Sequence, residues 1–157
     1  MRTLDEIDRR LVEILQRDGR ITFQRLSRSV ALSPRPTLER VRRLEREGVI
    51  TGYTAVLDTR RPGNLITVVA EVTLRDQGRQ TQAQFERRIA ACPEAVACHL
   101  VSGAFDYVVR FACPSLEAYR VLTSSWIDDP TLGVARIVSM PELKTIKEFH
   151  GYSLPAE

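Results

Sequence analysis

Arginine is concentrated between residues 23 and 46, where seven Arg stand against two Glu. The guanidinium group is planar and permanently charged, and it pairs bidentately with phosphate oxygens or with the edge of a guanine base. The same residues also fit an ordinary solvated surface, with ion pairs such as Glu39–Arg43 between successive helical turns. Combined with the elements that carry it, the cluster predicts a surface that binds double-stranded DNA.

Residue types needed for metal binding and covalent catalysis are sparse and unsuitably spaced. The cysteines at 92, 98 and 113 form no C-x-x-C pair, and His99 and His150 lack the spacing of a metal site. The common nucleotide-binding and hydrolase motifs G-x-x-x-x-G-K-[ST], G-x-G-x-x-G and G-x-S-x-G do not occur. We therefore expect no catalytic residues, no metal site and no cofactor.

Charge is divided unevenly along the 157 residues, whose formal net charge is +3. The first 60 residues hold 13 Arg and 9 acidic residues, whereas the remainder holds 10 basic and 11 acidic residues. This length suits one ordinary domain or two small ones, and the asymmetry favours a basic half that meets a polyanion. No apolar run approaches the roughly 20 residues of a membrane span, and the charged start MRTLDEIDRR does not resemble a secretory signal. We expect a cytoplasmic protein with no membrane partner.

Three short helices are predicted in the N-terminal third of the chain. Apolar residues recur at helical spacing from Leu4 to Leu15, and Thr22 fits the N-cap of a second helix. Ser33 and Pro34 fit the N-cap and first position of a third helix, which Gly48 ends. The inward side of that third helix is predicted to carry Leu38, Val41 and Leu44.

A short ribbon is predicted after the helices, because residues 49–57 alternate around Gly52. Three helices followed by a ribbon describe a winged helix-turn-helix over residues 1–57, in which the start of the third helix enters the major groove. Residues there are candidates for contacts with base edges: Ser33, Arg35, Pro36, Thr37 and Arg40. Candidates for phosphate contacts are Arg42, Arg43 and Arg46 further along, with Arg20, Thr22 and Gln24 near the second helix.

A hydrophilic linker over residues 58–64, containing Pro62-Gly63, predicts a domain boundary. Beyond it, the patterns predict strands and helices in the order βαββαβ, over residues 66–74, 80–91, 96–101, 105–113, 116–127 and 134–146. This order is that of a ferredoxin-like domain, here residues 65–157, with both helices on one face of an antiparallel sheet. The chain is thus expected to be α+β, and its bare sheet face is expected to pair with a second copy.

At this point the sequence resembles a known family. LDEIDRRLVEILQRDGRI and LSRSVALSPRPTLERVRRLEREGVITGYTAVLD are similar to the DNA-binding domain of the Lrp/AsnC regulators. VACHLVSGAFDYVVRF and RIVSMPELKTIKEFHGYSL are similar to the RAM-type effector domain of that family. The resemblance covers residues 4–154. It implies a transcriptional regulator that binds operator DNA as a homodimer, commonly assembled into an octamer, and senses an amino acid or related small molecule.

The resemblance also implies an effector site in the loop between the two middle strands. The family's G-x-x-D pattern falls on Gly103-Ala104-Phe105-Asp106. Glycine in a tight turn lets backbone amides approach an effector carboxylate, and Asp106 offers an anion to an α-amino group. Ser102, Phe105 and Tyr107 flank the loop, and Ser139 holds the one hydroxyl kept from a Thr-x-Thr-like pair in the last strand.

Two positions depart from the family pattern in the helix-turn-helix. The turn has Ala31 where glycine is usual, and a left-handed backbone there would cost alanine about 1 kcal/mol. Pro36 disfavours helical geometry at Arg35, which predicts an irregular start of the third helix.

Two other functions compete with DNA-dependent regulation. An enzyme similar to sirohaem decarboxylases would share the two-domain layout and draw on residues such as His99 and Arg110. A stand-alone sensor would use the basic helices only to solvate the fold. Because neutralising phosphates releases counterions, a steep loss of DNA affinity with salt distinguishes the regulator from the sensor.

Overall fold

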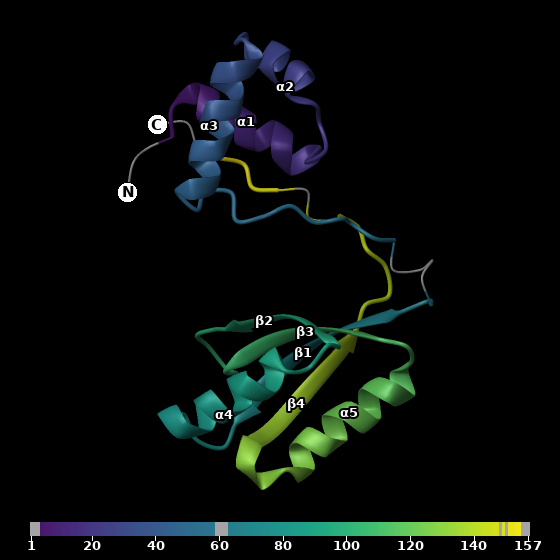
Figure 1. Ribbon diagram of the computed structural model, residues 1–157. Coiled ribbons are helices and arrows are strands. Elements are labelled where there is room, and N and C mark those ends of the chain that lie inside the picture. Colours follow the sequence, from purple (N-terminus) through teal and green to yellow (C-terminus); the bar gives the residue numbers. More distant parts are fainter. Residues whose placement is uncertain (1–3, 59–62, 148, 150, 155–157) are drawn as a thin grey trace. The chain divides into compact units, whose positions relative to one another are not determined.

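The computed structural model describes residues 4–58, 63–147, 149 and 151–154 (Figure 1). The chain forms two compact units. The first spans residues 1–56 and takes in the C-terminal segment that begins at Ile146. The second spans residues 57–145. Among the described residues, no helix has the length and apolar character needed to cross a membrane.

Three helices build the first unit, as predicted: α1 (Glu6–Arg17), α2 (Phe23–Ser29) and α3 (Pro34–Arg46). Their N-caps are Asp5, Thr22 and Ser33. The carboxylate of Asp5 accepts from the backbone N–H of Asp8, and the hydroxyl of Thr22 accepts from that of Arg25. These bonds satisfy donors that a helix start leaves unpaired. The shared core contains Leu11, Val12, Leu26, Val30, Val41 and Leu44.

The turn between α2 and α3 has a left-handed backbone at Ala31, whose φ is 54°. An alanine in this conformation is strained, because its Cβ crowds the following carbonyl oxygen. The predicted irregular start of α3 is not seen. Pro34 and Pro36 occupy the first and third helical positions, where the missing N–H groups have no partner within the helix in any case.

The segment after α3 differs from the predicted ribbon, because no strand is assigned to residues 49–58. Gly48, at a φ of 72°, turns the chain, and the backbone N–H groups of Gly48 and Val49 donate to carbonyls of α3. Gly52 does not adopt the left-handed conformation that a tight two-residue hairpin requires. The hydroxyl of Tyr53 instead donates to Glu45 at 3.0 Å, which anchors the segment on α3.

The C-terminal segment packs on α1 rather than on the sheet. The side chain of Gln16 donates to the carbonyl of Tyr152 at 3.1 Å and accepts from its backbone N–H at 2.6 Å. Leu154 packs against the core of the first unit. The predicted domain of residues 65–157 therefore contributes its C-terminal end to the first compact unit. The bonds join residues 136 positions apart, a pairing that no local pattern announces.

Four antiparallel strands form the sheet of the second unit in the order β2-β3-β1-β4 (Figure 1). The strands are β1 (Ile66–Leu74), β2 (Ala95–Leu100), β3 (Tyr107–Cys113) and β4 (Val134–Pro141). Helices α4 (Arg79–Ala90) and α5 (Leu116–Asp128), with the short 3-10 helix η1 (Pro130–Leu132), complete the unit. The βαββαβ order and the α+β class are as predicted.

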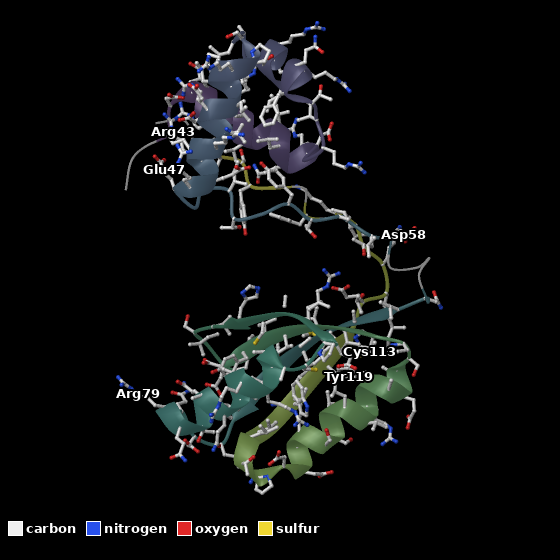
Figure 2. The ribbon with its side chains drawn as sticks, viewed as in Figure 1. Arg43, Glu47, Asp58, Arg79, Cys113 and Tyr119 are labelled. Carbon is white, nitrogen blue, oxygen red and sulfur yellow. The ribbon has the colours of Figure 1, made fainter. Side chains whose placement is uncertain are left out.

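Aromatic rings fill the space between the helices and one face of the sheet. Trp126 of α5 contacts Phe85 of α4 and Phe111 of β3, with ring centroids 6.0 and 5.5 Å apart. Tyr119 lies 5.5 Å from Phe111, and Figure 2 shows it on α5 with Cys113 at the end of β3. Alternate residues of β1 and β3 point into this core, which leaves the other set on the face without helices.

Candidate nucleic-acid interface and effector site

A charged stripe runs along the solvent side of α3. Arg35, Glu39, Arg42 and Arg46 are all exposed and recur at the spacing that places residues on one side of a helix. Arg35 is the most open, with 91% of its side chain exposed, and its guanidinium lies 3.5 Å from Glu39. This stripe forms an exposed, mainly basic side of α3.

Other predicted DNA contacts lie at the two helix starts and are also exposed. Ser33 and Pro36 lie at the start of α3, and the hydroxyl of Ser33 makes no capping hydrogen bond. At the start of α2, Arg20, Thr22 and Gln24 are exposed, although Thr22 also caps the helix. Helix N-termini offer backbone N–H groups to phosphates, so these positions suit contacts to the DNA backbone.

Thr37 is fully buried, which corrects its prediction as a base contact. Its hydroxyl donates to the carbonyl of Ser33 at 3.0 Å. It lies on the same side of α3 as Val41 and Leu44, whereas Leu38, which was predicted to point inward, is only half-buried. The small side chain of Thr37 occupies the inward position at the start of the helix because its only polar group is satisfied by the preceding turn.

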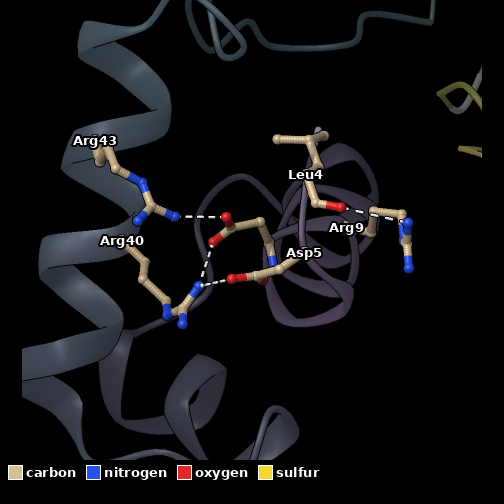
Figure 3. A network of polar contacts seen from close by, with 6 residues as sticks. Leu4, Asp5, Arg9, Arg40 and Arg43 are labelled. Atoms are coloured by element: carbon tan, nitrogen blue, oxygen red, sulfur yellow. Dashed lines mark hydrogen bonds and ion pairs between the residues drawn. The ribbon is translucent and has the colours of Figure 1, made fainter. Parts of the chain in front are cut away.

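Arg40 and Arg43 point toward α1 and form ion pairs there (Figure 3). Arg40 lies 2.6 Å from Asp5 and 2.8 Å from Asp8, and Arg43 lies 2.5 Å from the second oxygen of Asp8. The hydrogen bonds that Arg40 donates to Asp5 and Asp8 raise the pKa of its guanidinium group. Burial raises the pKa of Asp5, but the bonds from Arg40 and the Asp8 N–H outweigh it and leave that pKa below its usual value.

The acidic partners of these arginines were missed by sequence reasoning. Neither Asp5 nor Asp8 was predicted to face the third helix, and Arg43 was paired with Glu39 instead. The available signal was the spacing of Asp5 and Asp8, which lie three residues apart at the start of an amphipathic helix. That spacing places two carboxylates on one side but does not reveal which helix they face.

The predicted effector loop connects β2 to β3 in the second unit. Ser102, Gly103 and Ala104 are exposed, and Phe105 is half-buried. Gly103 has a φ of 140°, a conformation that favours glycine, and a Cβ built there would meet nothing within 4 Å. The loop backbone is therefore open to approach from outside.

Asp106 has a structural role that corrects its prediction as a free anion. Only 7% of it is exposed. Its carboxylate accepts from the backbone N–H of Leu74 at 2.7 Å and from the side-chain amide of Gln77 at 2.8 Å. Both oxygens are thus used to hold the end of β1 and the segment that leads to α4.

Tyr107 and Ser139 both make contacts within the unit, and the burial of Tyr107 corrects its prediction as a pocket residue. Tyr107 is buried in the core, and its hydroxyl donates to Glu86 at 3.0 Å. Burial and this bond raise its pKa, so the phenol stays neutral. The hydroxyl of Ser139 lies 2.5 Å from that of Tyr119. The loop residues 102–105 and the exposed Ser139 remain the accessible part of the predicted site.

Groups suited to metal binding are not brought together in the described part of the chain. Among those residues, no cluster of three or more His, Cys, Asp or Glu side chains is able to hold a metal ion. Burial raises the pKa of the thiols of Cys92, Cys98 and Cys113, which favours the neutral form over the thiolate that binds metals.

Comparisons with known proteins agree with both units. A winged helix-turn-helix DNA-binding model matches residues 4–51, and an Lrp/AsnC ligand binding domain model matches residues 67–152. The leucine-responsive regulatory protein of Escherichia coli K12 is 46% identical over 119 residues, which is 76% of this chain and 73% of the relative.

Solved structures extend the similarity to nearly the whole chain. A transcriptional regulator from Neisseria meningitidis in complex with L-methionine has a TM-score of 0.86 at 28% identity, covering 93% of this chain and 94% of the other. A feast or famine regulatory protein from Mycobacterium tuberculosis, also complexed with L-methionine, has a TM-score of 0.82 at 32% identity, covering 96% and 99%. The chain is a DNA-binding transcriptional regulator that belongs to the Lrp/AsnC family.

Proposed function

We propose that this regulator reads DNA with the exposed stripe of α3 and changes its assembly or its operator binding when an amino acid or related metabolite binds the second unit. The observation that carries the DNA-binding part is the stripe of Arg35, Glu39, Arg42 and Arg46 on a helix whose opposite side is buried. The ligand-binding domain match and the L-methionine complexes of two structural neighbours support the effector part.

Gel shifts or fluorescence polarisation on a duplex selected from a random pool test the DNA-binding part. Replacing Arg35 and Arg42 with Ala removes two cations from the stripe and should weaken binding by about 10-fold or more, since each good bidentate base contact contributes about 1–3 kcal/mol. Arg120→Ala is a matched control, because Arg120 is exposed on α5 and pairs with Glu117. Unchanged affinity in the stripe variant would contradict the proposal.

The bare face of the sheet is the proposed dimer interface. Val69 pairs in register with Arg110 on one side and Met140 on the other, and Glu71 lies between Val108 and Val138. These residues alternate with core residues, so the face without helices carries Val69, Val108, Val138 and Met140 beside the charged Glu71 and Arg110. A second copy of the chain covers it, and dimers assemble further, up to an octamer.

Light scattering after size exclusion tests this assembly. Val138→Arg introduces a charge on the β4 side of the face and should yield monomers, because an unpaired buried charge costs several kcal/mol. Val121→Arg on the exposed side of α5 is the control and should leave the assembly intact. An unaltered mass for Val138→Arg would exclude this face as the interface.

The loop 102–105 is the proposed contact for the effector, at a site completed by neighbouring copies. Thermal shift with L-methionine and L-leucine tests it, since a ligand at 100-fold its Kd stabilises by about 2.7 kcal/mol. Ala104→Trp blocks the loop and should abolish the shift, whereas Ala91→Trp, at an exposed position after α4, should retain it. If Ala104→Trp keeps the full thermal shift, the effector does not bind at this loop.

The proposed regulator acts in the cytoplasm and without catalysis. Its effector shifts an equilibrium between states that differ in effector affinity and in DNA binding, which needs no chemical step. The effector should therefore be recovered unchanged after prolonged incubation with the protein, as measured by chromatography.

A further inference from the structure

Two carboxylates at the start of α1 engage two of the arginines of α3. Asp8 is 4% exposed and bridges both guanidinium groups, while Asp5 adds a second bond to Arg40 and caps α1. We call this set, Asp5, Asp8, Arg40 and Arg43, the carboxylate clamp (Figure 3). It joins segments more than 30 residues apart in sequence.

Arg40 and Arg43 lie on the flank of the exposed stripe of α3 and are not fully buried. Arg43 follows Glu39 by four residues and precedes Arg46 by three, so it lies next to the stripe on the helix surface. The side chains of Arg40 and Arg43 are 26% and 27% exposed, so part of each remains open to solvent. A phosphate at this flank would compete with Asp8 for the same guanidinium groups.

The carboxylates have the advantage in that competition. They are held within 2.5–2.8 Å of the guanidinium nitrogens by the fold itself, whereas a phosphate must be brought from solution. Leaving Asp8 without its partners would strand a buried charge, which is strongly unfavourable. Arg40 and Arg43 are therefore expected to keep their ion pairs with Asp5 and Asp8 while the neighbouring stripe contacts DNA.

We propose that Asp5 and Asp8 set the DNA specificity of this regulator by withholding Arg40 and Arg43 from phosphates. Phosphate contacts supply sequence-independent affinity, so two fewer contacts lower non-specific binding without removing any group of the stripe. The inference rests on the DNA-binding function of α3. It assigns to Asp5 and Asp8 a positioning role that acts through the two arginines.

The salt dependence of non-specific binding tests the proposal. The measurement is the affinity for a random-sequence duplex between about 50 and 200 mM salt, where each phosphate contact adds about 0.9 to the slope of log K against log salt. Asp8→Asn keeps the shape of the side chain but removes its charge. It should steepen the slope by about 0.9 to 1.8 and reduce the preference for a selected duplex. An unchanged or shallower slope would overturn the proposal.

The double variant Arg40→Gln/Arg43→Gln is the matched control, and its far-UV circular dichroism spectrum is first compared with that of the unaltered protein, because the variant leaves Asp8 without its ionic partners. It should have the same slope of log K against log salt as the unaltered protein. Adding Asp8→Asn to the double variant should not change that slope further. If Arg40→Gln/Arg43→Gln alone makes the slope shallower, the arginines already contact phosphates and the clamp idea fails. If the native protein binds neither duplex at low salt, the DNA-binding function itself fails.

A milder variant covers the case in which Asp8→Asn does not fold. Asp5→Asn removes one partner of Arg40 but keeps a residue that caps helices as well as Asp does. The far-UV circular dichroism spectrum verifies folding before DNA is added. This variant should steepen the slope by up to about 0.9 if Arg40 is released, and no change would count against the proposal.

Discussion

Thirteen buried residues, five of them aromatic, form the core of the second unit, whereas the first unit is built on six buried aliphatic side chains. The first unit supplements this small core with the carboxylate clamp, with helix caps and with the C-terminal segment that binds Gln16. A small domain buries a smaller share of its surface, so polar and charged contacts carry more of its stability. The unit that presents charges to DNA therefore also depends on charges for its own structure.

The largest expected change in stability comes from a substitution in the aromatic core of the second unit. Phe111→Ala removes a ring that lies 5.5 Å from both Tyr119 and Trp126, and should lower the free energy of unfolding of the second unit by about 3–5 kcal/mol. Trp126 is the only tryptophan, so its fluorescence during urea titration follows this unit alone. A loss below 1 kcal/mol would show that the rings do not act as a packed core.

A smaller effect is expected from releasing the C-terminal segment. Gln16→Ala/Leu154→Ala removes two hydrogen bonds and an apolar contact, and should destabilise the first unit by about 1–3 kcal/mol. Circular dichroism should detect an earlier loss of helix, while the Trp126 fluorescence transition stays in place. A shift of both transitions together would mean that the two units unfold as one.

A substitution in the turn before α3 is expected to increase the stability of the first unit. Ala31→Gly relieves the left-handed strain at a φ of 54° and should stabilise the first unit by about 0.5–1 kcal/mol, after the greater flexibility of unfolded glycine is subtracted. Thermal unfolding measures the gain. Ala91→Gly, at a C-cap with a φ of −91°, should destabilise instead.

The smallest expected effect is an acid dependence that belongs to the first unit. The folded pKa of Asp5 lies below the unfolded value of about 3.9, so its contribution to stability is present above that pH and is lost as pH falls through the folded pKa. Asp5→Asn should make the helix signal of the first unit less dependent on pH below about 4. An identical acid profile for the variant would assign the dependence to other carboxylates.

Much of the fold follows from local patterns that the sequence displays. The caps at Asp5 and Thr22, the turn at Gly48 and the left-handed Ala31 each depend on a few neighbouring residues, and the alternation in β1 and β3 marks their buried side. These features are predictable because backbone geometry and amphipathic spacing act over short distances.

The candidate site depended much more on tertiary structure. Every arginine of α3 was predicted to contact DNA. In the structure Arg35 and Arg42 face solvent, whereas Arg40 and Arg43 form ion pairs with α1, more than 30 residues away in sequence. Asp106 was predicted to bind the effector, but its carboxylate accepts hydrogen bonds from Leu74 and Gln77. Thr37 took the inward position that Leu38 was expected to fill.

The sequence by itself thus determined the helices of the first unit, the βαββαβ order of the second and the concentration of positive charge that marks the DNA-binding unit. Tertiary structure alone decided which charges remain available, because a guanidinium or carboxylate takes its partner from whatever the fold brings within about 3 Å. The same holds for the C-terminal segment, because its bonds to Gln16 join residues that are 136 positions apart in the sequence.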